Sequence, residues 1–251
     1  MERFFLAPLG RAEPDDMQGW MEQGGCLALQ RALAMDGAAL REALNGAKRR
    51  DGQGILSLEA GQPACVVLPL GPMAHPARLL VEELPAWLLE GAILLARACE
   101  QHRAILYLEQ AQLSHRRLLE QVITSLTTLG VLGEAGWGGG VTVESRQSSP
   151  PLEVLDAVTT QLLPLLLWRR RDPGTTLLAV RGAVTAPAIY EIPLGLSTRQ
   201  LVYQWAGGVT TTHPLFTLGE QRVEGKELSI PLHFDHFGTA LGSGHLTVSE
   251  R

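Results

Sequence analysis

The feature that most constrains the fold is an alternation of short apolar runs and longer amphipathic segments. Residues 64–70 have the pattern of a buried strand, and leucines at helical spacing follow over residues 78–101. A second strand over residues 104–108 and a second helix over residues 114–129 repeat this order. Strand–helix–strand–helix order predicts a parallel sheet with covering helices, and therefore an α/β fold.

The pattern changes after the turn residues 172–174. Beyond them we expect short strands and one short helix, over residues 176–182, 188–192, 198–205 (the helix), 227–232 and 245–248. This order of elements predicts a small β-grasp-like α+β module. We therefore divide the chain into an α/β domain, residues 1–171, and a β-grasp domain, residues 172–251.

Three further segments complete the predicted secondary structure. Residues 1–23 are expected to form an irregular arm. Residues 24–48 fit two short helices, with Asp36 as the N-cap of the second. A helix over residues 152–170 ends in three arginines at 169–171, where the helix dipole favours positive charge. An anion site at these arginines is the alternative interpretation.

Composition and charge exclude several classes of protein. The chain has 251 residues, of which 45% are hydrophobic and 19% charged, as is typical of a folded globular protein. With 21 basic and 26 acidic residues, its net charge of -5 offers no attractive field to nucleic acid. The most apolar stretch, residues 161–168, is too short for a bilayer, which needs about 20 residues.

Cysteines and histidines indicate neither a cluster nor a metal site. Three widely spaced cysteines cannot supply four thiolates to an iron–sulfur cluster, and with no signal peptide visible they predict a cytoplasmic location. His233 and His236 are interpreted as surface or capping positions in an extended or turn segment rather than as metal ligands. Ser243 lacks the G-x-S-x-G pattern of a nucleophile elbow. Cys65 is expected to be an inert buried thiol, and Trp137 a candidate partner anchor.

The segment with the most chemistry is the glycine-bearing loop within residues 44–59, between a helical pattern and the first strand. In an α/β protein such a loop cradles a phosphate with its backbone N–H groups. Here Arg49, Arg50 and Asp51 place bulky charged side chains where the backbone would have to approach a ligand. The function of the chain depends on whether this loop still binds a ligand.

The chain resembles the NADH-binding flavoprotein subunit of respiratory complex I, a module that also occurs in NAD-linked hydrogenases and formate dehydrogenases. LLAVRGAVTAPAIYEIPLGLSTRQLV, residues 177–202, is similar to that family's β-grasp (SLBB) domain. ELSIPLHFDHFGTALGSGHLTVSE, residues 227–250, is similar to the segment that leads out of it, and LLEGAILLARA, residues 88–98, to the first long helix of the flavin domain. The resemblance implies a Rossmann-like flavin domain followed by an SLBB-like domain.

The flavin loop departs from the family pattern, which reads G-R-G-G-A-G. The corresponding stretch here is RRDGQG, residues 49–54, so two glycines are replaced by Arg49 and Asp51. The family also carries an asparagine and carboxylates after its first strand, whereas residues 66–71 have no polar side chain. Both departures remove groups that the resemblance implies for flavin and nucleotide binding.

Further departures follow along the chain. Residues 109–112 replace the family's Arg-Gly-Glu-Tyr, and its Gly-Glu-Glu-Thr signature is missing near residues 136–149. Asp156-Ala157 stand where the family has paired asparagines, and the sequence ends at Arg251, where the family continues into a cysteine-rich cluster domain. We therefore interpret the chain as a degenerate, truncated relative whose flavin site has been vacated.

From this interpretation we predict a non-catalytic structural or accessory subunit of a formate-dehydrogenase-, hydrogenase- or complex I-like redox complex. It would have no cofactor, no catalytic residue and no metal, and would contact iron–sulfur or molybdenum subunits. The alternative is a divergent FMN-binding NAD(P)H dehydrogenase subunit, in which Arg49 or Arg50 holds the flavin phosphate beside Gly52 and Gly54. A second alternative is a binding module that captures a small ligand or a protein through its β-grasp domain.

Overall fold

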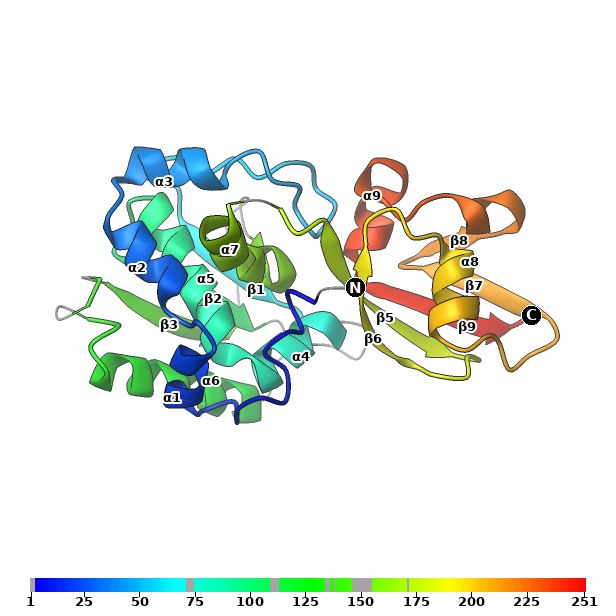
Figure 1. Ribbon diagram of the computed structural model, residues 1–251, viewed down its shortest axis with the longest axis horizontal. Helices are drawn as coiled ribbons and strands as arrows, with labels where there is room; N and C mark the ends of the chain where they lie inside the picture. Colours follow the sequence, from blue (N-terminus) through cyan, green and yellow to red (C-terminus); the bar gives the residue numbers. More distant parts are fainter. Residues whose placement is uncertain are drawn as a thin grey trace.

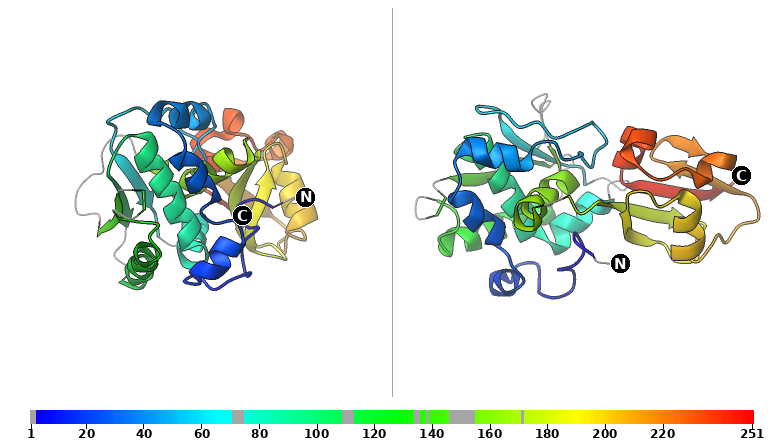
Figure 2. Two further views of the ribbon diagram at one scale, coloured as in Figure 1. Left: turned by 60° about the vertical axis from the view of Figure 1, so that its left-hand side comes forward. Right: turned by 45° about the horizontal axis from the view of Figure 1, so that its top comes forward.

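The computed structural model describes residues 3–70, 75–108, 113–133, 136–137, 139–145, 155–170 and 172–251. Two parts lie side by side along its long axis (Figure 1). The first, blue to green, combines a sheet with most of the helices, and the second, yellow-green to red, is built around another sheet. Figure 2 shows the same separation from a second direction.

The first sheet is entirely parallel among the described strands. It consists of β1 (Ala64–Leu68), β2 (Arg103–Leu108), β3 (Gly140–Ser145) and β4 (Leu155–Asp156), in the order β3-β2-β1-β4. The predicted α/β fold is confirmed. Strand order reverses between β1 and β4, and the carboxyl ends of strands at such a switch point are where open α/β sheets bind ligands.

Helices of the first part lie before and between these strands. They are α1 (Met17–Glu22), α2 (Leu27–Leu33), α3 (Gly37–Leu44), α4 (His75–Glu83), α5 (Pro85–Ala98), α6 (Leu113–Thr128) and α7 (Ala157–Arg169). Helix α5 is central, because it packs on β1, β2 and α7. Pro85 begins it at a position where the missing N–H costs nothing, and every residue except Arg97 is buried. Arg97 instead donates to the carbonyls of Ala32, in the last turn of α2, and of Met35, just after that helix.

The second sheet is mixed. Its strands are β5 (Thr175–Gly182), β6 (Ala188–Pro193), β7 (Pro214–Leu218), β8 (Gln221–Val223) and β9 (His245–Glu250), in the order β6-β5-β9-β7-β8. Strands β5 and β6, which match the expected strands over residues 176–182 and 188–192, pair antiparallel, and β9 joins β5 in parallel. One face carries α8 (Thr198–Gln200), which continues as a π-helical turn, Leu201–Trp205. Helix α9 (Phe234–Gly242) precedes β9.

Three predicted segments differ in the structure. Residues 227–232 are not a strand: a 3-10 helix, Gly225–Ser229, occupies their start, stabilised by the Glu227 side chain, which accepts from Glu224 N at 3.1 Å. His236 lies within α9 rather than in an extended or turn segment, and His233, whose backbone is extended, is the N-cap of that helix. The arm contains α1, which Asp16 caps by accepting from Gly19 N at 2.9 Å.

The two parts are joined by strand β5 and by the N-terminal segment. Leu177 packs into the hydrophobic core of the first part and the adjacent Leu178 into that of the second, because successive side chains of a strand point to opposite faces. Phe4 N and Leu6 N donate to the Glu191 carboxylate on β6, at 2.9 and 3.1 Å. The division at residues 171 and 172 stays a prediction. Among the described residues, no helix is long and apolar enough to cross a membrane.

Candidate functional site

The glycine-bearing loop between α3 and β1 folds into a tight hairpin. Gly46 N donates to Leu56 O at 2.9 Å, and Arg49 N donates to Gly54 O at 3.0 Å. Gly52 and Gly54 have φ angles of +75° and +97°, a region that glycine adopts without strain. The hairpin therefore has a defined shape, and its tip consists of residues 50–53.

The tip is pressed against the second part of the molecule. A Cβ atom at Gly52 would overlap the backbone of Gly238 in α9, and a Cβ at Gly242 would overlap the carbonyl of Asp51. Lys48 at the base of the hairpin pairs with Asp235 in the first turn of α9. Glycines on both sides thus allow direct backbone contact between the loop and α9.

Arg50 extends from the hairpin into the protein. Its side chain has 0% exposure, and it stands at the arginine of the G-R-G-G-A-G pattern. The guanidinium donates to Thr175 O at 2.8 Å, to Lys48 O at 2.6 Å and to the Asp172 carboxylate. These acceptors belong to the loop itself and to the start of β5, so Arg50 ties the loop to the second sheet.

Arg49 and Asp51 pair with each other beside the N-terminus of α7. Asp156, the N-cap of that helix, accepts from Val158 N at 2.8 Å and Thr159 N at 3.0 Å. The Thr159 hydroxyl donates to the same carboxylate and accepts from Arg50 N at 2.8 Å. Burial raises the pKa of Asp156, and the neighbouring Asp51 charge raises it further.

These residues occupy the switch point between β1 and β4, where a phosphate would sit on the α7 N-terminus. Two N–H donors in the first turn of the helix, those of Val158 and Thr159, are already bonded to Asp156, and a second carboxylate, Asp51, lies close by. Carboxylates repel an incoming anion. The residues present therefore do not fit an FMN phosphate at this helix end.

Two cavities flank the loop. One of about 150 Å³ is lined by Arg49, Ser57, Cys65 and Leu155 among others, and is smaller than the roughly 300–1,000 Å³ of usual ligand pockets. The other, of about 490 Å³, lies between α2, α3 and the C-terminal end of α7. Arg170 lines this larger cavity, whereas the side chain of Arg169 and all of Arg171 are outside the described residues.

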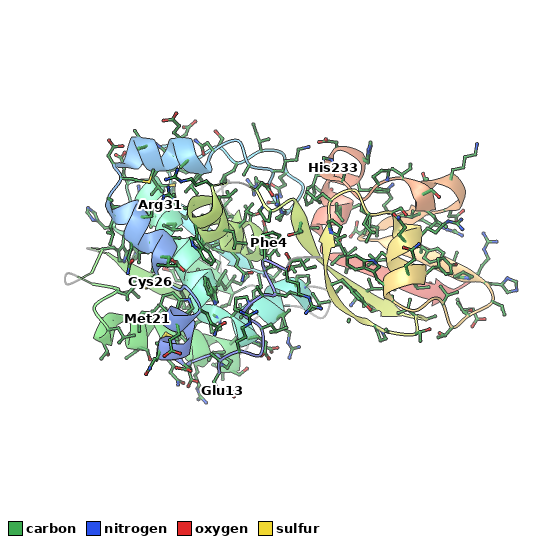
Figure 3. All side chains as sticks on the ribbon, in the orientation of Figure 1. Phe4, Glu13, Met21, Cys26, Arg31 and His233 are labelled. Carbon is green, nitrogen blue, oxygen red and sulfur yellow. The ribbon has the colours of Figure 1, made fainter. Side chains whose placement is uncertain are left out.

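The remaining sequence candidates lie apart from the loop or serve the fold. The His233 and His236 rings are 6.3 Å apart at the start of α9, where Figure 3 labels His233. Ser243 donates to Ala240 O at 2.7 Å, which closes the turn after α9. Cys65 is buried in β1, and Trp137 is half-buried against the first core. Within the described ranges, no group of three or more His, Cys, Asp or Glu side chains could hold a metal.

Several departures from the family pattern cannot be placed. Residues 109–112, 146–154 and part of 134–138 lie outside the described residues. The assignment of Arg49, Arg50, Gly52 and Gly54 to a flavin stays a prediction.

Sequence reasoning missed Glu90, which is 1% exposed within α5. Burial raises the pKa of Glu90 to about 7, although backbone N–H groups of Leu29, Cys26 and Ala28 oppose the rise. Burial, and secondarily the Glu90 charge, raises the pKa of the Cys26 thiol to about 12. A glutamate inside the otherwise apolar segment at residues 88–98 was the available signal.

The chain is similar to curated NADH-quinone oxidoreductase subunits, although no protein-family model matches it. The matching NADH-quinone oxidoreductase subunit of Escherichia coli (strain K12) is 23% identical over 229 residues, which cover 70% of this chain and 52% of that protein. Its counterpart in Mycobacterium tuberculosis (strain ATCC 25618 / H37Rv) is 26% identical over 209 residues, which cover 62% of this chain and 47% of that protein. The chain spans about half the length of the curated relatives that it matches.

Solved structures of an NAD+-reducing [NiFe]-hydrogenase have the same fold. Its H2-reduced state superposes with a TM-score of 0.69 and 19% identity, over 95% of this chain and 51% of that chain. Its air-oxidised state gives a TM-score of 0.67 and 17% identity, over 93% of this chain and 50% of that chain. Together with the curated relatives, these matches confirm the predicted resemblance to the NADH-binding flavoprotein subunit.

The prediction that the chain has no cofactor is wrong. The matched proteins are named for reactions of NADH and NAD+, and the resemblance that they confirm is to a flavoprotein subunit. The prediction rested on the charged side chains of the loop and on the missing asparagine, carboxylate and Gly-Glu-Glu-Thr positions of the family. In the structure Arg50 is turned into the protein, and Arg49 and Asp51 are folded onto each other. FMN is the cofactor that the relationship implies.

Proposed function

We propose that the chain is a structural or accessory subunit of a multi-subunit redox complex of the formate-dehydrogenase, hydrogenase or complex I type. The main observation behind this proposal is that the chain's own side chains lie at the switch point between β1 and β4 and bond one another there. Arg49 pairs with Asp51 there, and Thr159 bonds both the Asp156 carboxylate and Arg50 N. Flavin binding in a shifted pose is compatible with this role, because an accessory subunit can retain a cofactor that it does not turn over.

Electrostatics supports a role outside catalysis. A dinucleotide and a flavin phosphate are anions. A helix N-terminus attracts anions through those N–H groups of its first turn that have no other partner. In α7, Asp156 has taken two first-turn donors, and its carboxylate lies near that of Asp51. The same groups hold the loop against α7 and, through Arg50, against β5. The loop is thus suited to joining the two sheets rigidly.

The second part supports the proposal as a docking module. Its strand order, with β9 parallel to β5 and between β5 and β7, is consistent with a β-grasp domain of the SLBB type. We therefore keep the division into residues 1–171 and 172–251 as part of the proposal. Partners that carry iron–sulfur or molybdenum centres, and a cytoplasmic location, belong to the same proposal.

A second candidate is a divergent FMN-binding NAD(P)H dehydrogenase subunit. It is favoured by the position of Arg49, whose side chain lines the cavity of about 150 Å³ next to the loop. Gly54 also leaves room, because a Cβ atom there would meet no other atom within 4 Å.

Restoring the family glycines tests the proposal. The double variant Arg49→Gly/Asp51→Gly should bind FMN at least about tenfold more tightly than the wild type, since it removes a carboxylate that acts on Asp156 and frees the loop backbone of two side chains. The control is Arg116→Ala/Glu120→Ala, which removes an exposed ion pair on α6. Tryptophan fluorescence quenching measures the affinity.

Assembly is tested with the same variants. Partner subunits should fail to assemble in cells that lack the chain, and both double variants should restore assembly, because neither changes the outer surface of the second sheet as a whole. Equal FMN affinity in all three proteins, together with NADH oxidation by the wild type, would overturn the proposal and favour the dehydrogenase subunit.

A further inference from the structure

A cavity of about 110 Å³ lies between the N-terminal arm and the helices α5 and α7. We call it the arm pocket. Its walls are mainly aromatic rings and prolines: Phe4, Pro8, Trp87, Pro164 and Trp168. Figure 3 labels Phe4 on the arm segment that crosses this region. The pocket lies away from the glycine-bearing loop, and none of its lining residues lines the cavity next to Arg49.

Two glutamine oxygens in the arm pocket lack a donor among the described residues. They are Oε1 of Gln161 on α7 and Oε1 of Gln23 after α1. Gln161 is 4% exposed, and its Nε2 faces the carbonyl of Phe5 at 3.4 Å. This contact fixes the orientation of the amide, because a carbonyl oxygen can only accept. The acceptor of Gln161 is therefore a buried, unpaired oxygen of a residue that lines the pocket.

An unpaired buried acceptor is unfavourable, at about 1–3 kcal/mol, so the site favours an occupant with a donor. Water would supply donors, but most of the wall is apolar and aromatic. The lining residues include Arg11 and no carboxylate, which disfavours a cation. A flat ring can contact the aromatic wall while one polar edge reaches Gln161.

The mouth of the pocket is also apolar. Trp168 is 39% exposed there, and Leu27, which is 42% exposed, lies beside it across Gly24. Both side chains lie within 3.4 Å of the position that a Cβ of Gly24 would take. An exposed aromatic next to a desolvated acceptor is typical of a recognition site.

We propose that the arm pocket binds one neutral aromatic ring that carries an O–H or N–H donor, with the donor bonded to Gln161 Oε1. A free small molecule and an aromatic side chain of a partner subunit share this chemistry. The cavity measures about 110 Å³, whereas one water molecule occupies about 30 Å³. The pocket therefore has room for a guest larger than a single water, and we assign it one ring.

Phenol and toluene form the test pair, because they have similar shapes and only phenol has a donor. Binding to the full chain is followed by the indole N–H signals of Trp87 and Trp168 in two-dimensional NMR. Phenol should bind saturably and shift these two signals. The ratio of phenol to toluene affinity should fall about tenfold in Gln161→Leu, the factor that one neutral hydrogen bond supplies.

Gln161→Leu should remain folded, because it removes an unpaired buried acceptor and one long hydrogen bond. The control is Gln18→Leu, an exposed glutamine on α1 that bonds only its neighbour Glu22 among the described contacts. This control should leave the affinity ratio unchanged.

A repeat with the assembled complex identifies the source of the ring. Phenol binding to the isolated chain alone would indicate that a partner side chain fills the pocket, and binding to both would indicate a small molecule. An unchanged ratio in Gln161→Leu, or no saturable binding by phenol, would overturn the proposal.

Discussion

Glu90 gives the chain a stability that depends on pH. Its carboxyl group lies in the core of α5, where Oε1 accepts from Leu29 N at 3.1 Å and Oε2 has no donor among the described residues. The folded protein holds the proton with a pKa of about 7, against 4.5 for an ordinary glutamate. The folded state therefore binds the proton more tightly than the unfolded state.

This difference in pKa sets the direction and the size of the change in the free energy of unfolding with pH. Below pH 4.5 both states are protonated and Glu90 has no effect on stability. As the pH rises towards about 7, the unfolded state ionises first, so the free energy of unfolding falls. Each pKa unit corresponds to about 1.36 kcal/mol, so the full loss is about 3 kcal/mol and is complete by about pH 8.

Glu90→Gln should abolish this loss, because a glutamine oxygen still accepts from Leu29 N and the side chain is never charged. Urea unfolding at pH 8 should show the variant to be more stable than the wild type by about 3 kcal/mol. At pH 5 the difference should shrink to about 1 kcal/mol or less. Glu42→Gln, on the exposed surface of α3, serves as the control and should show no such change. A difference that is the same at both pH values would refute the reasoning.

Two further predictions concern the contact between the loop and the second sheet. Arg50→Met should lower the free energy of unfolding by about 1–3 kcal/mol, because it removes the donor to the buried acceptor Thr175 O and the ion pair with Asp172, whose carboxylate keeps the N–H of Gly174. Urea unfolding measures this change, and a value below about 0.5 kcal/mol would contradict it. Gly242→Ala should cost about 1–3 kcal/mol and speed hydrogen exchange at the loop tip, because its Cβ would overlap Asp51 O. Gly140→Ala, where a Cβ would meet no atom within 4 Å, is the control, and equal effects would argue against the close contact.

The fold of the first part was predictable because its signals are local. The apolar run at β1 is buried as expected, and Asp36 caps α3 by accepting from Ala39 N at 2.8 Å. Local signals also explain the errors in the second part. Residues 227–232 alternate like a strand, yet the reciprocal bonds of Glu224 and Glu227 favour a 3-10 turn.

The candidate site was predictable only in part. Glycine spacing located the loop, and the structure places it at the switch point with Asp156. The partners of Arg50, however, include Thr175 O and Asp172, both more than 100 residues away in sequence. No local pattern distinguishes an arginine that holds a phosphate from one that ties two sheets together. The arm pocket likewise depends on Phe4 and Gln161, which only the fold brings together.

The most direct test of the accessory role is the steady-state oxidation of NADH by the isolated full-length chain in saturating FMN, with ferricyanide as electron acceptor. We expect a rate no faster than that of the same concentration of free FMN, because the switch point is held by Asp156 and the Arg49–Asp51 pair. Turnover that saturates with NADH, at about 1 s⁻¹ or faster as in ordinary enzymes, would contradict it and make the chain a catalytic dehydrogenase subunit.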